Sequence, residues 1–400
     1  MVVQAISAAV RFSFGVLIDP LIEEYGWSRG AISLAYSLQF LVGIPAVLVA
    51  GRLAEKTDSR RIVIGGTIIF TVGMLLTATI SEVWQFQFYY GVLAGGLGSS
   101  AFITVLPVLL TRWFHRKLGL AMGVMWVSVS LGPSVFMPLV RWSIEAMGWG
   151  DTFIIFGVVG GILMLASSFF LRDHPGEMGL TAYGSQDIET AQVNTGSGVA
   201  AFSWRQITVN SSFWFLIAVH ALGCVGHSIP LAHMVSMATF VGIAGITAAG
   251  VLSVATAASL FSRLGMSFVA EAKGGRFTLA LVLLLQTLPT MLLLNAREVP
   301  LFYSFALLFG LGYGGEMVGF PIFNRQYYGN NAPLNTIYSY QMAGAMLGMS
   351  VGGWLGGTLF DLTGVYTWSV LASVGASMLG MIAALMLPLH YAHPHSSDVA

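Results

Sequence analysis

The amino-acid sequence predicts an all-α integral membrane protein, with twelve transmembrane helices in two pseudo-symmetric six-helix bundles. Of its 400 residues, 56% are hydrophobic and only 8% are charged, whereas roughly a quarter of the residues in a soluble globular protein carry charge. Apolar runs of about 20 residues, each long enough to cross a bilayer, recur along the whole chain. Features of the first half return in the second half at a near-constant offset, which indicates an internal repeat.

The apolar runs divide the chain into four segments. Residues 1–171 are the expected N-terminal six-helix half, 172–209 a linker rich in Gly, Ser, Thr and acidic residues, 210–388 the C-terminal half, and 389–400 a tail. We expect the twelve spans near 2–22, 30–54, 62–81, 84–111, 119–142, 150–171, 210–240, 245–270, 277–295, 299–325, 334–360 and 366–388.

The repeat is visible in matched residues of the two halves. The offset is 216 near both ends of the repeat and 214 in its middle, and the order of the matched residues is the same in both halves. Chance matches would not keep this order. The matched pairs include Gly26 and Gly242, Glu55 and Glu271, Arg60 and Arg276, Pro107 and Pro321, and Glu145 and Asp361.

Basic residues are distributed unevenly between the two sets of loops. If both termini are cytoplasmic, twelve of the 17 basic residues fall in cytoplasmic loops, three on the opposite side and two, Arg11 and Arg263, inside spans. Cytoplasmic loops carry an excess of Lys and Arg. We therefore expect a multi-pass cell-membrane protein with cytoplasmic termini, lipid as its surroundings and no nucleic-acid partner. Cys224 is the single cysteine, so no intramolecular disulfide is possible.

Arg263 is a lone charge within the eighth span. It lies eight residues before Glu271, so at about 1.5 Å per residue it is roughly 12 Å inside the membrane boundary. A charge at that depth costs on the order of 2.5–3.5 kcal/mol and needs a partner or a watered cavity. A guanidinium group offers a donor fork that matches a carboxylate. We therefore expect an anion site here; the alternative is an internal ion pair that only fixes helix packing.

Two further sequence segments lead to a family resemblance. The loop after the second span reads Gly51-Arg-Leu-Ala-Glu55-Lys56-Thr-Asp58-Ser-Arg60-Arg61. Between spans two and three of a six-span repeat, it resembles the signature of the major facilitator superfamily. This resemblance implies a motif that controls conformation at the cytoplasmic face, with its counterpart in the second half. The residues we assign to it are Gly51, Glu55, Arg60, Arg61, Arg112, Glu271 and Arg276.

More narrowly, the chain resembles the monocarboxylate-transporter family in its bacterial branch. Trp113-Phe-His-Arg116-Lys117-Leu-Gly-Leu120-Ala121 is similar to the family signature entering the fifth span, and Ser259-Leu-Phe-Ser-Arg263 is similar to its eighth helix. The resemblance implies that Arg263 binds the substrate carboxylate. Ser259 replaces an acid that many animal members have, and Arg11 lies close to the position of their first-span lysine. The related oxalate:formate antiporter has an eleventh-span lysine that is missing here.

Glu316 and His227 are the candidate proton-coupling residues. Glu316 lies at a depth similar to that of Arg263, so a substrate anion competing for Arg263 would favour proton uptake by Glu316. The alternatives are a permanent Glu316–Arg263 ion pair or a helix-packing acid. His227 is the repeat partner of Arg11, so both are expected to face one cavity, and an imidazole there suits proton transfer; the alternative is a packing histidine, as we expect for His220 and His233.

Further candidate substrate contacts follow from the repeat and from polarity. Phe102 is the repeat partner of Glu316 and is expected to form an apolar wall opposite it, while Tyr338 and Gln341 in the eleventh span supply neutral donors. Packing roles are the alternative for these two. The histidines of the seventh span do not share one helix face, which argues against a metal site made by that helix alone. We expect neither a metal nor a cofactor.

These patterns predict a secondary transporter that moves a small organic anion by alternating access, and we expect the anion to be a monocarboxylate that moves together with protons. Export of a larger amphipathic compound and organic-anion exchange are the alternatives. Enzyme function is not expected, because the sequence has no H-E-x-x-H, P-loop or paired-cysteine motif. One chain contains two complete halves, so we expect a functional monomer.

Overall fold

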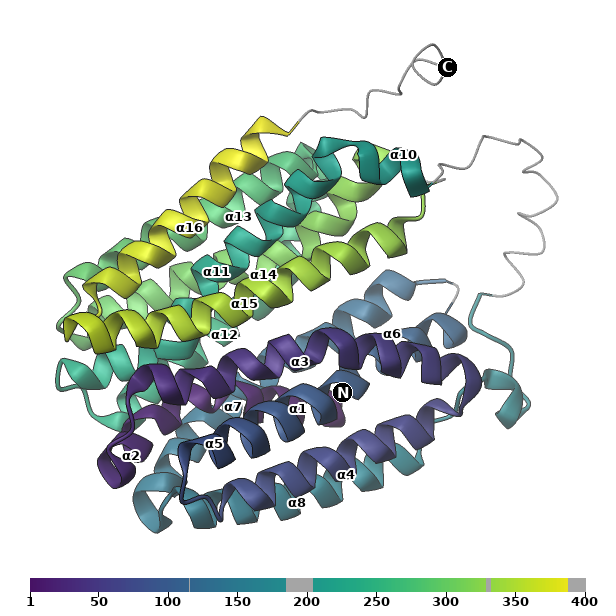
Figure 1. Cartoon of the computed structure of the whole chain (residues 1–400). Coiled ribbons are helices and arrows are strands. Elements are labelled where there is room, and N and C mark those ends of the chain that lie inside the picture. Colours follow the sequence, from purple (N-terminus) through teal and green to yellow (C-terminus); the bar gives the residue numbers. More distant parts are fainter. Residues whose placement is uncertain (115, 185–203, 329–331, 388–400) are drawn as a thin grey trace.

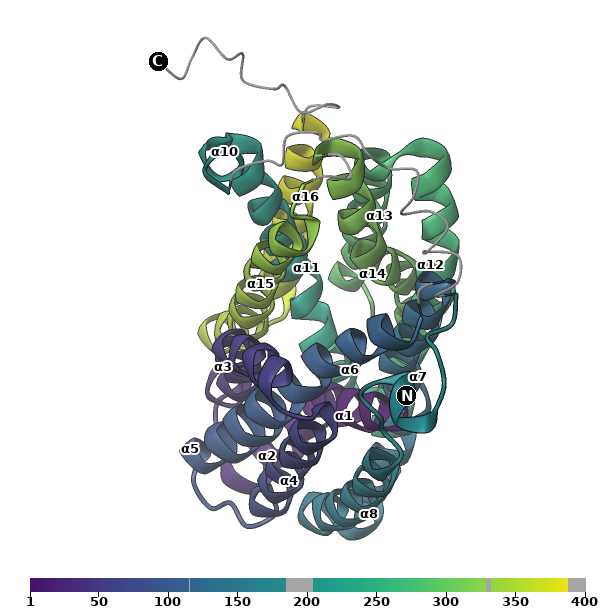
Figure 2. The same cartoon turned by 90° about the vertical axis from the view of Figure 1, so that its right-hand side faces the viewer.

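The computed structural model describes residues 1–114, 116–184, 204–328 and 332–387. Within these ranges the chain is helical and has no strand beyond an isolated bridge between Phe114 and Tyr183. Figures 1 and 2 show two helix bundles, one from the first part of the chain and one from the second. Much of the expected linker (185–203) and all of the expected tail (389–400) lie outside the described residues.

The helices follow the expected order of spans. The N-terminal bundle consists of α1 (Val2–Phe12), α2 (Phe14–Tyr25), α3 (Arg29–Lys56), α4 (Ser59–Thr77), α5 (Val83–Phe86), the π-helix η1 (Gln87–Gly98), α6 (Ser99–Trp113), α7 (Leu118–Met147) and α8 (Trp149–Phe169), with the short η2 (Pro175–Met178) after it. The C-terminal bundle consists of α10 (Trp204–Val209), α11 (Ser211–Phe240), α12 (Gly245–Lys273), α13 (Gly275–Thr290), η3 (Met291–Leu294), α14 (Val299–Tyr328), α15 (Leu334–Thr363) and α16 (Thr367–Met386).

Ten helices of the described chain are long and apolar enough to cross a membrane, and α1 with α2 makes an eleventh if the bent pair is one span. The remaining expected span corresponds to α15. Its 30 residues give it sufficient length, but its glycines lower its mean hydropathy. α15 packs between α11 and α3, and its exposed face carries large apolar side chains, among them Leu347, Val351 and Trp354, as a lipid-facing surface requires.

The first span is broken, which the sequence did not lead us to expect. α1 and α2 meet at Ser13 with a bend of 40°. Pro20 in α2 has no N–H, so it leaves the carbonyl of Val16 without its helical partner. Arg141 of α7 donates to this carbonyl at 3.4 Å, and Tyr90 donates to the carbonyl of Val10 at 2.7 Å. Neighbouring helices thus satisfy the backbone groups of the broken span, as membrane burial requires.

The two bundles touch at the end of the molecule opposite the linker, which we call the far end; the other is the linker end. α3 packs on α15, α7 on α12 and α2 on α11. The hydrogen bonds that join the halves in the described chain lie between the middle of the bundle and the far end, for example Gly30 N–H to Asp361 at 2.6 Å and Ser130 to Ser259 at 2.9 Å. Figure 1 shows the bundles diverging toward the linker.

Candidate functional site

A central cavity lies between the two halves and is lined by both. α1, α3, α6 and α7 of the first half face α11, α12, α14 and α15 of the second half. The cavity has a volume of about 120 Å³. Its lining residues are Gln4, Arg11, Phe12, Phe40, Ile103, Trp126, Val129, His220, Cys224, His227, Arg263, Tyr313, Glu316, Met317, Met342, Ala345, Met346 and Met349.

Arg263 lines this cavity, is only 8% exposed and has no ion pair within 4 Å in the described chain. Its Nε donates to Ser130 Oγ of α7 at 3.1 Å, and Ser130 shares a hydrogen bond of 2.9 Å with Ser259. Ser259 in turn donates to the carbonyl of Thr256 at 2.7 Å. The serines therefore orient the guanidinium without neutralising it, which leaves its charge available to an anion.

Arg11 is a second cation on the opposite half. It lines the cavity from α1, its Cζ lies 5.1 Å from the centre of the Phe40 ring, and its buried Nε has no hydrogen-bond partner in the described chain. A cation over an aromatic face is stabilised, but this stabilisation is weaker than that of an ion pair. The cavity therefore holds two guanidinium groups, one from each half, without a carboxylate partner among the described residues.

Glu316 is paired with His227, not with Arg263. The His227 Nδ1 to Glu316 Oε2 distance is 2.9 Å, and Gln286 of α13 donates to the same oxygen at 2.6 Å. The alternative of a permanent Glu316–Arg263 ion pair is wrong in this structure. The second carboxylate oxygen, Oε1, is buried and has no hydrogen-bond partner among the described residues. The ring of Tyr313 lies 5.1 Å from that of His227 and 5.8 Å from Arg263 Cζ, so one tyrosine contacts both groups.

Ser259 and three other residues expected at the site do not line the cavity. Phe102 is fully buried inside the N-terminal half, with its ring 6.3 Å from that of Phe70, and the next residue, Ile103, lines the cavity instead. Gln341 makes a reciprocal amide pair with Asn324 at 2.8 and 2.9 Å. Tyr338 packs against the apolar cluster at the linker end of the C-terminal half.

The expected conformational motif lies at the linker end. Arg112 forms an ion pair with Asp173 at 3.3 Å and donates to the carbonyl of Ala54 at 3.3 Å. Asp173 also accepts the N–H of Ser59 at 2.9 Å, so this acid, which sequence reasoning missed, connects α4 to Arg112.

The other motif residues make separate contacts. Arg60 lies over the Phe169 ring at 5.0 Å, and Arg276 donates to the carbonyl of Leu385. Arg61 and Glu271 are exposed, and Gly51 packs near Thr104. The Glu55 side chain lies outside the described structure.

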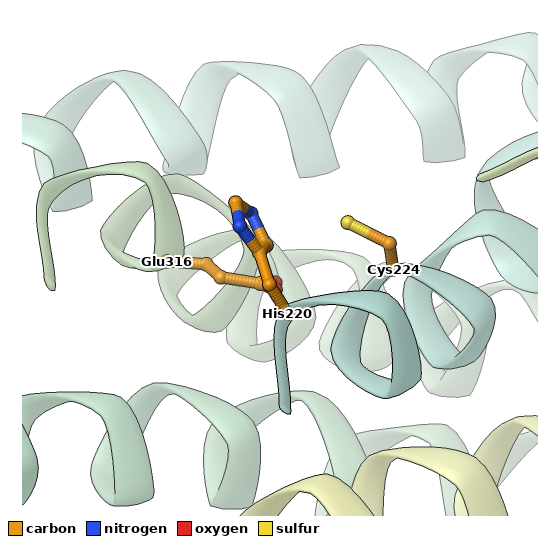
Figure 3. A group of neighbouring side chains, drawn as sticks. All are labelled: His220, Cys224 and Glu316. Carbon is orange, nitrogen blue, oxygen red and sulfur yellow. The ribbon is translucent and has the colours of Figure 1, made fainter. Parts of the chain in front are cut away.

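His220, Cys224 and Glu316 form a tight polar group on the cavity wall (Figure 3). One potential ligand atom from each residue lies within 4.8 Å of the others, a spacing that a metal ion would need to contract. The His220 ring, however, stacks on Phe320 at 3.9 Å, and Glu316 already accepts hydrogen bonds from His227 and Gln286. We therefore interpret the group as part of the polar wall of the cavity.

Two polar residues of the site were missed from the sequence. Ser130 is one of several serines in the fifth span, and nothing in the sequence distinguishes it. Gln286 is different, because it is the one strongly polar residue in the run Leu283-Leu-Leu-Gln-Thr-Leu288. A lone amide at that depth needs a hydrogen-bonding partner, so the sequence alone could have identified Gln286 as a candidate site residue.

Two six-helix bundles around a charged central cavity define the class of membrane transporters that work by alternating exposure of one site. The comparison with known families agrees with this class. A model of the Major Facilitator Superfamily matches residues 1–333. The chain belongs to the major facilitator superfamily and is a multi-pass membrane transporter.

Its curated relatives are similar at low identity over nearly their full length. Monocarboxylate transporter 13 of Rattus norvegicus is 25% identical, covering 96% of this chain and 86% of the relative. The oxalate:formate antiporter of Oxalobacter formigenes is 23% identical, covering 95% and 88%. Among solved structures, a bacterial homologue of the human lysosomal transporter Spinster, inward-facing and unoccupied, superposes with a TM-score of 0.68 at 13% identity, covering 96% of this chain and 92% of the other. This last likeness concerns the fold alone.

Proposed function

We propose that the protein transports a monocarboxylate and that Arg263 holds the carboxylate. The observation that carries this proposal is a buried guanidinium that faces the central cavity without any carboxylate partner in the described chain. Its Nε is held by Ser130, and its terminal nitrogens offer the donor geometry that carboxylates accept. Two relatives are a monocarboxylate transporter and an oxalate:formate antiporter, and their names support the same class of substrate.

The His227–Glu316 pair is our candidate for proton coupling. Tyr313 lies between this pair and Arg263, so the pair is close enough to respond to the substrate charge in a low-dielectric site. A monoanion at Arg263 adds one negative charge to the cavity, and one proton taken up by the pair cancels it. The loaded cavity then has the same net charge as the empty one, which favours reorientation of the loaded halves in the membrane field.

We further propose that the linker end is cytoplasmic. The excess of basic residues lies in the loops at this end, including Arg60, Arg61, Arg112 and Arg276. With this orientation both termini are cytoplasmic, the protein resides in the cell membrane, and the structure is closed to the outside. A single chain supplies the whole cavity, which supports function as a monomer.

Uptake of labelled carboxylates into proteoliposomes, with and without an inward proton gradient, tests the proposal. We expect saturable uptake of monocarboxylates that the gradient stimulates. Arg263→Ala removes charge-assisted hydrogen bonds worth roughly 3 kcal/mol, so uptake should fall about 100-fold. Arg297→Ala, which changes an exposed arginine between α13 and α14, is the matched control and should transport normally. Normal uptake by folded Arg263→Ala would refute the assignment.

Anion exchange is the second candidate function, and one observation favours it. Arg11 and Arg263 place two guanidinium groups without carboxylate partners in the cavity of the described chain. With this excess charge in its cavity, the empty transporter reorients less readily than the loaded one. If exchange dominates, carboxylate efflux should require a carboxylate on the opposite side, whatever the proton gradient.

A further inference from the structure

The wall of the central cavity is rich in methionine. Four of the lining residues, which we call the methionine wall, are Met317 of α14 and Met342, Met346 and Met349 of α15. The three on α15 are four and three residues apart, so they share one helix face. Trp126 of α7 and Phe40 of α3 line the same cavity from the other half. An apolar surface therefore accompanies the cationic groups.

The cavity is larger than a two- or three-carbon acid requires. Its volume of about 120 Å³ has room for several water molecules. An acid the size of lactate would fill only part of this space. Its carboxylate would contact Arg263, but it has no apolar body to displace water from the methionine wall.

Methionine side chains are flexible and polarisable, so they adapt to ligands of different shape and make favourable contacts with aromatic rings. The wall also adjoins the contact between the halves, because a Cβ atom placed on Gly43 of α3 would lie 2.6 Å from Met346 Cε. The apolar part of a ligand on the methionine wall therefore contacts side chains whose packing against α3 changes when the two halves move. This position allows apolar contacts to influence transport as well as binding.

We propose that the preferred substrates are amphipathic monocarboxylates, in which the carboxylate on Arg263 is attached to an aromatic or branched apolar body that contacts the methionine wall and Trp126. This inference rests on the proposed function and specifies its substrate class. The polar wall formed by His220, Cys224 and Glu316 is then the part of the cavity that remains hydrated.

Pyruvate and phenylpyruvate are the test pair, because they carry the same carboxylate and keto group and differ by a phenyl ring. Half-saturation concentrations would be measured by uptake into proteoliposomes, and dissociation constants by direct binding to detergent-purified protein. Burial of a phenyl ring predicts a half-saturation concentration for phenylpyruvate about tenfold lower than that for pyruvate. Met346→Ala should lower the ratio of the pyruvate to the phenylpyruvate half-saturation concentration several-fold, because it shortens the surface that the phenyl ring contacts.

Met378→Ala is the control, since Met378 is a 47% exposed methionine on α16 outside the cavity, and it should keep the full preference. Saturable uptake of both acids with half-saturation values within about twofold would overturn the inference while the proposed function stands. Equal weakening of both acids by Met346→Ala would also overturn it, since that variant would then act on the structure and not on the apolar body. Absence of uptake and of binding for both acids would overturn the proposed function itself.

Discussion

Arg263 and Arg11 both present guanidinium groups to the cavity, but their surroundings differ. Arg263 Nε is held by the Ser130 hydroxyl, whereas Arg11 lies over the Phe40 ring and its Nε has no partner in the described chain. A held guanidinium recognises a carboxylate by geometry, and a loosely held one contributes chiefly charge. The two arginines should therefore differ in their tolerance of lysine, which keeps the charge but loses the donor fork.

We expect Arg263→Lys to raise the half-saturation concentration at least about tenfold, because a lysine loses one bond of the bidentate pair, worth roughly 1.5 kcal/mol. Arg11→Lys should remain within about threefold of the parent. Uptake kinetics of the two variants at equal protein density in proteoliposomes check this difference. Equal sensitivity of both positions would show that neither arginine recognises the carboxylate through the geometry of its guanidinium donors.

Glu316→Gln should separate coupling from transport. The glutamine cannot take up a proton, but its amide oxygen can still accept from Gln286, so the fold is preserved better than with alanine. We expect the proton gradient to lose its effect on uptake, while exchange of carboxylate across the membrane persists. Glu298→Gln, at an exposed acid before α14, should keep full stimulation. If Glu316→Gln instead lowers both exchange and thermal stability, the acid is structural.

At the scale of single elements, the glycines of α15 determine how closely it packs. Gly348 and Gly352 face α11, where an added Cβ would lie 2.9 Å from Cys224 Cβ and 2.9 Å from Ser228 Cβ. Gly353 and Gly357 face α3 on the other half, near Tyr36 and Ser33. Small residues of this kind allow membrane helices to approach closely. α15 thus uses one glycine stripe within its own half and another between halves.

Gly348→Ala should lower the thermal stability of the detergent-solubilised protein, because the methyl group overlaps the α11 backbone at Ala221 and overpacking costs about 1–3 kcal/mol. Gly375→Ala on α16 is the matched control, since a Cβ there meets no atom within 4 Å. Alanine favours a helix over glycine by up to about 1 kcal/mol, so the control should be neutral or slightly stabilising. Equal effects of both substitutions would contradict the close packing of α15 on α11.

Element positions were predictable from the sequence, but helix rotation was not. The apolar runs located each span, and depth along a helix placed Arg11, His227, Arg263 and Glu316 together at the cavity. Phe102 does not line the cavity because the π-helix η1 precedes α6. Each π turn holds an extra residue, which rotates the side chains of the following helix about its axis. The Ser130 contact depends on how α7 crosses α12, and the Gln286 contact on how α13 crosses α14, which no periodicity specifies.

For the whole molecule, the repeat places an acid of each half beside a helix N-terminus of the other. Asp361 of α15 accepts the N–H groups of Arg29 and Gly30 at 3.0 and 2.6 Å, which caps α3. Its repeat partner Glu145 lies beside Gly245, the first residue of α12, and pairs with Arg141 at 2.8 Å. Carboxylates are stabilised at helix N-termini. The two acids thus occupy pseudo-symmetric places, and the hydrogen bonds of Asp361 to α3 join the two halves at the far end.

Loss of one of these contacts should shift the molecule toward opening at the far end. Asp361→Ala leaves two N–H groups of α3 without their acceptor and removes the favourable charge at the helix N-terminus, worth about 0.5–2 kcal/mol. Cys224, the only cysteine, lines the cavity and reports its accessibility. In oriented membranes, a thiol reagent that does not cross the bilayer should label Cys224 from the far side several-fold faster in Asp361→Ala than in the parent.

The control for this shift is another acidic cap at the same end, placed within one half. Glu82 is the N-cap residue of α5 in the N-terminal half, so Glu82→Ala removes an acid at a helix N-terminus without touching the contact between halves. It should leave labelling of Cys224 from the far side unchanged, and labelling from the linker side should fall only in Asp361→Ala. Faster labelling from both sides at once would indicate general loosening and would contradict the far-end contact as the element that opens and closes the pathway.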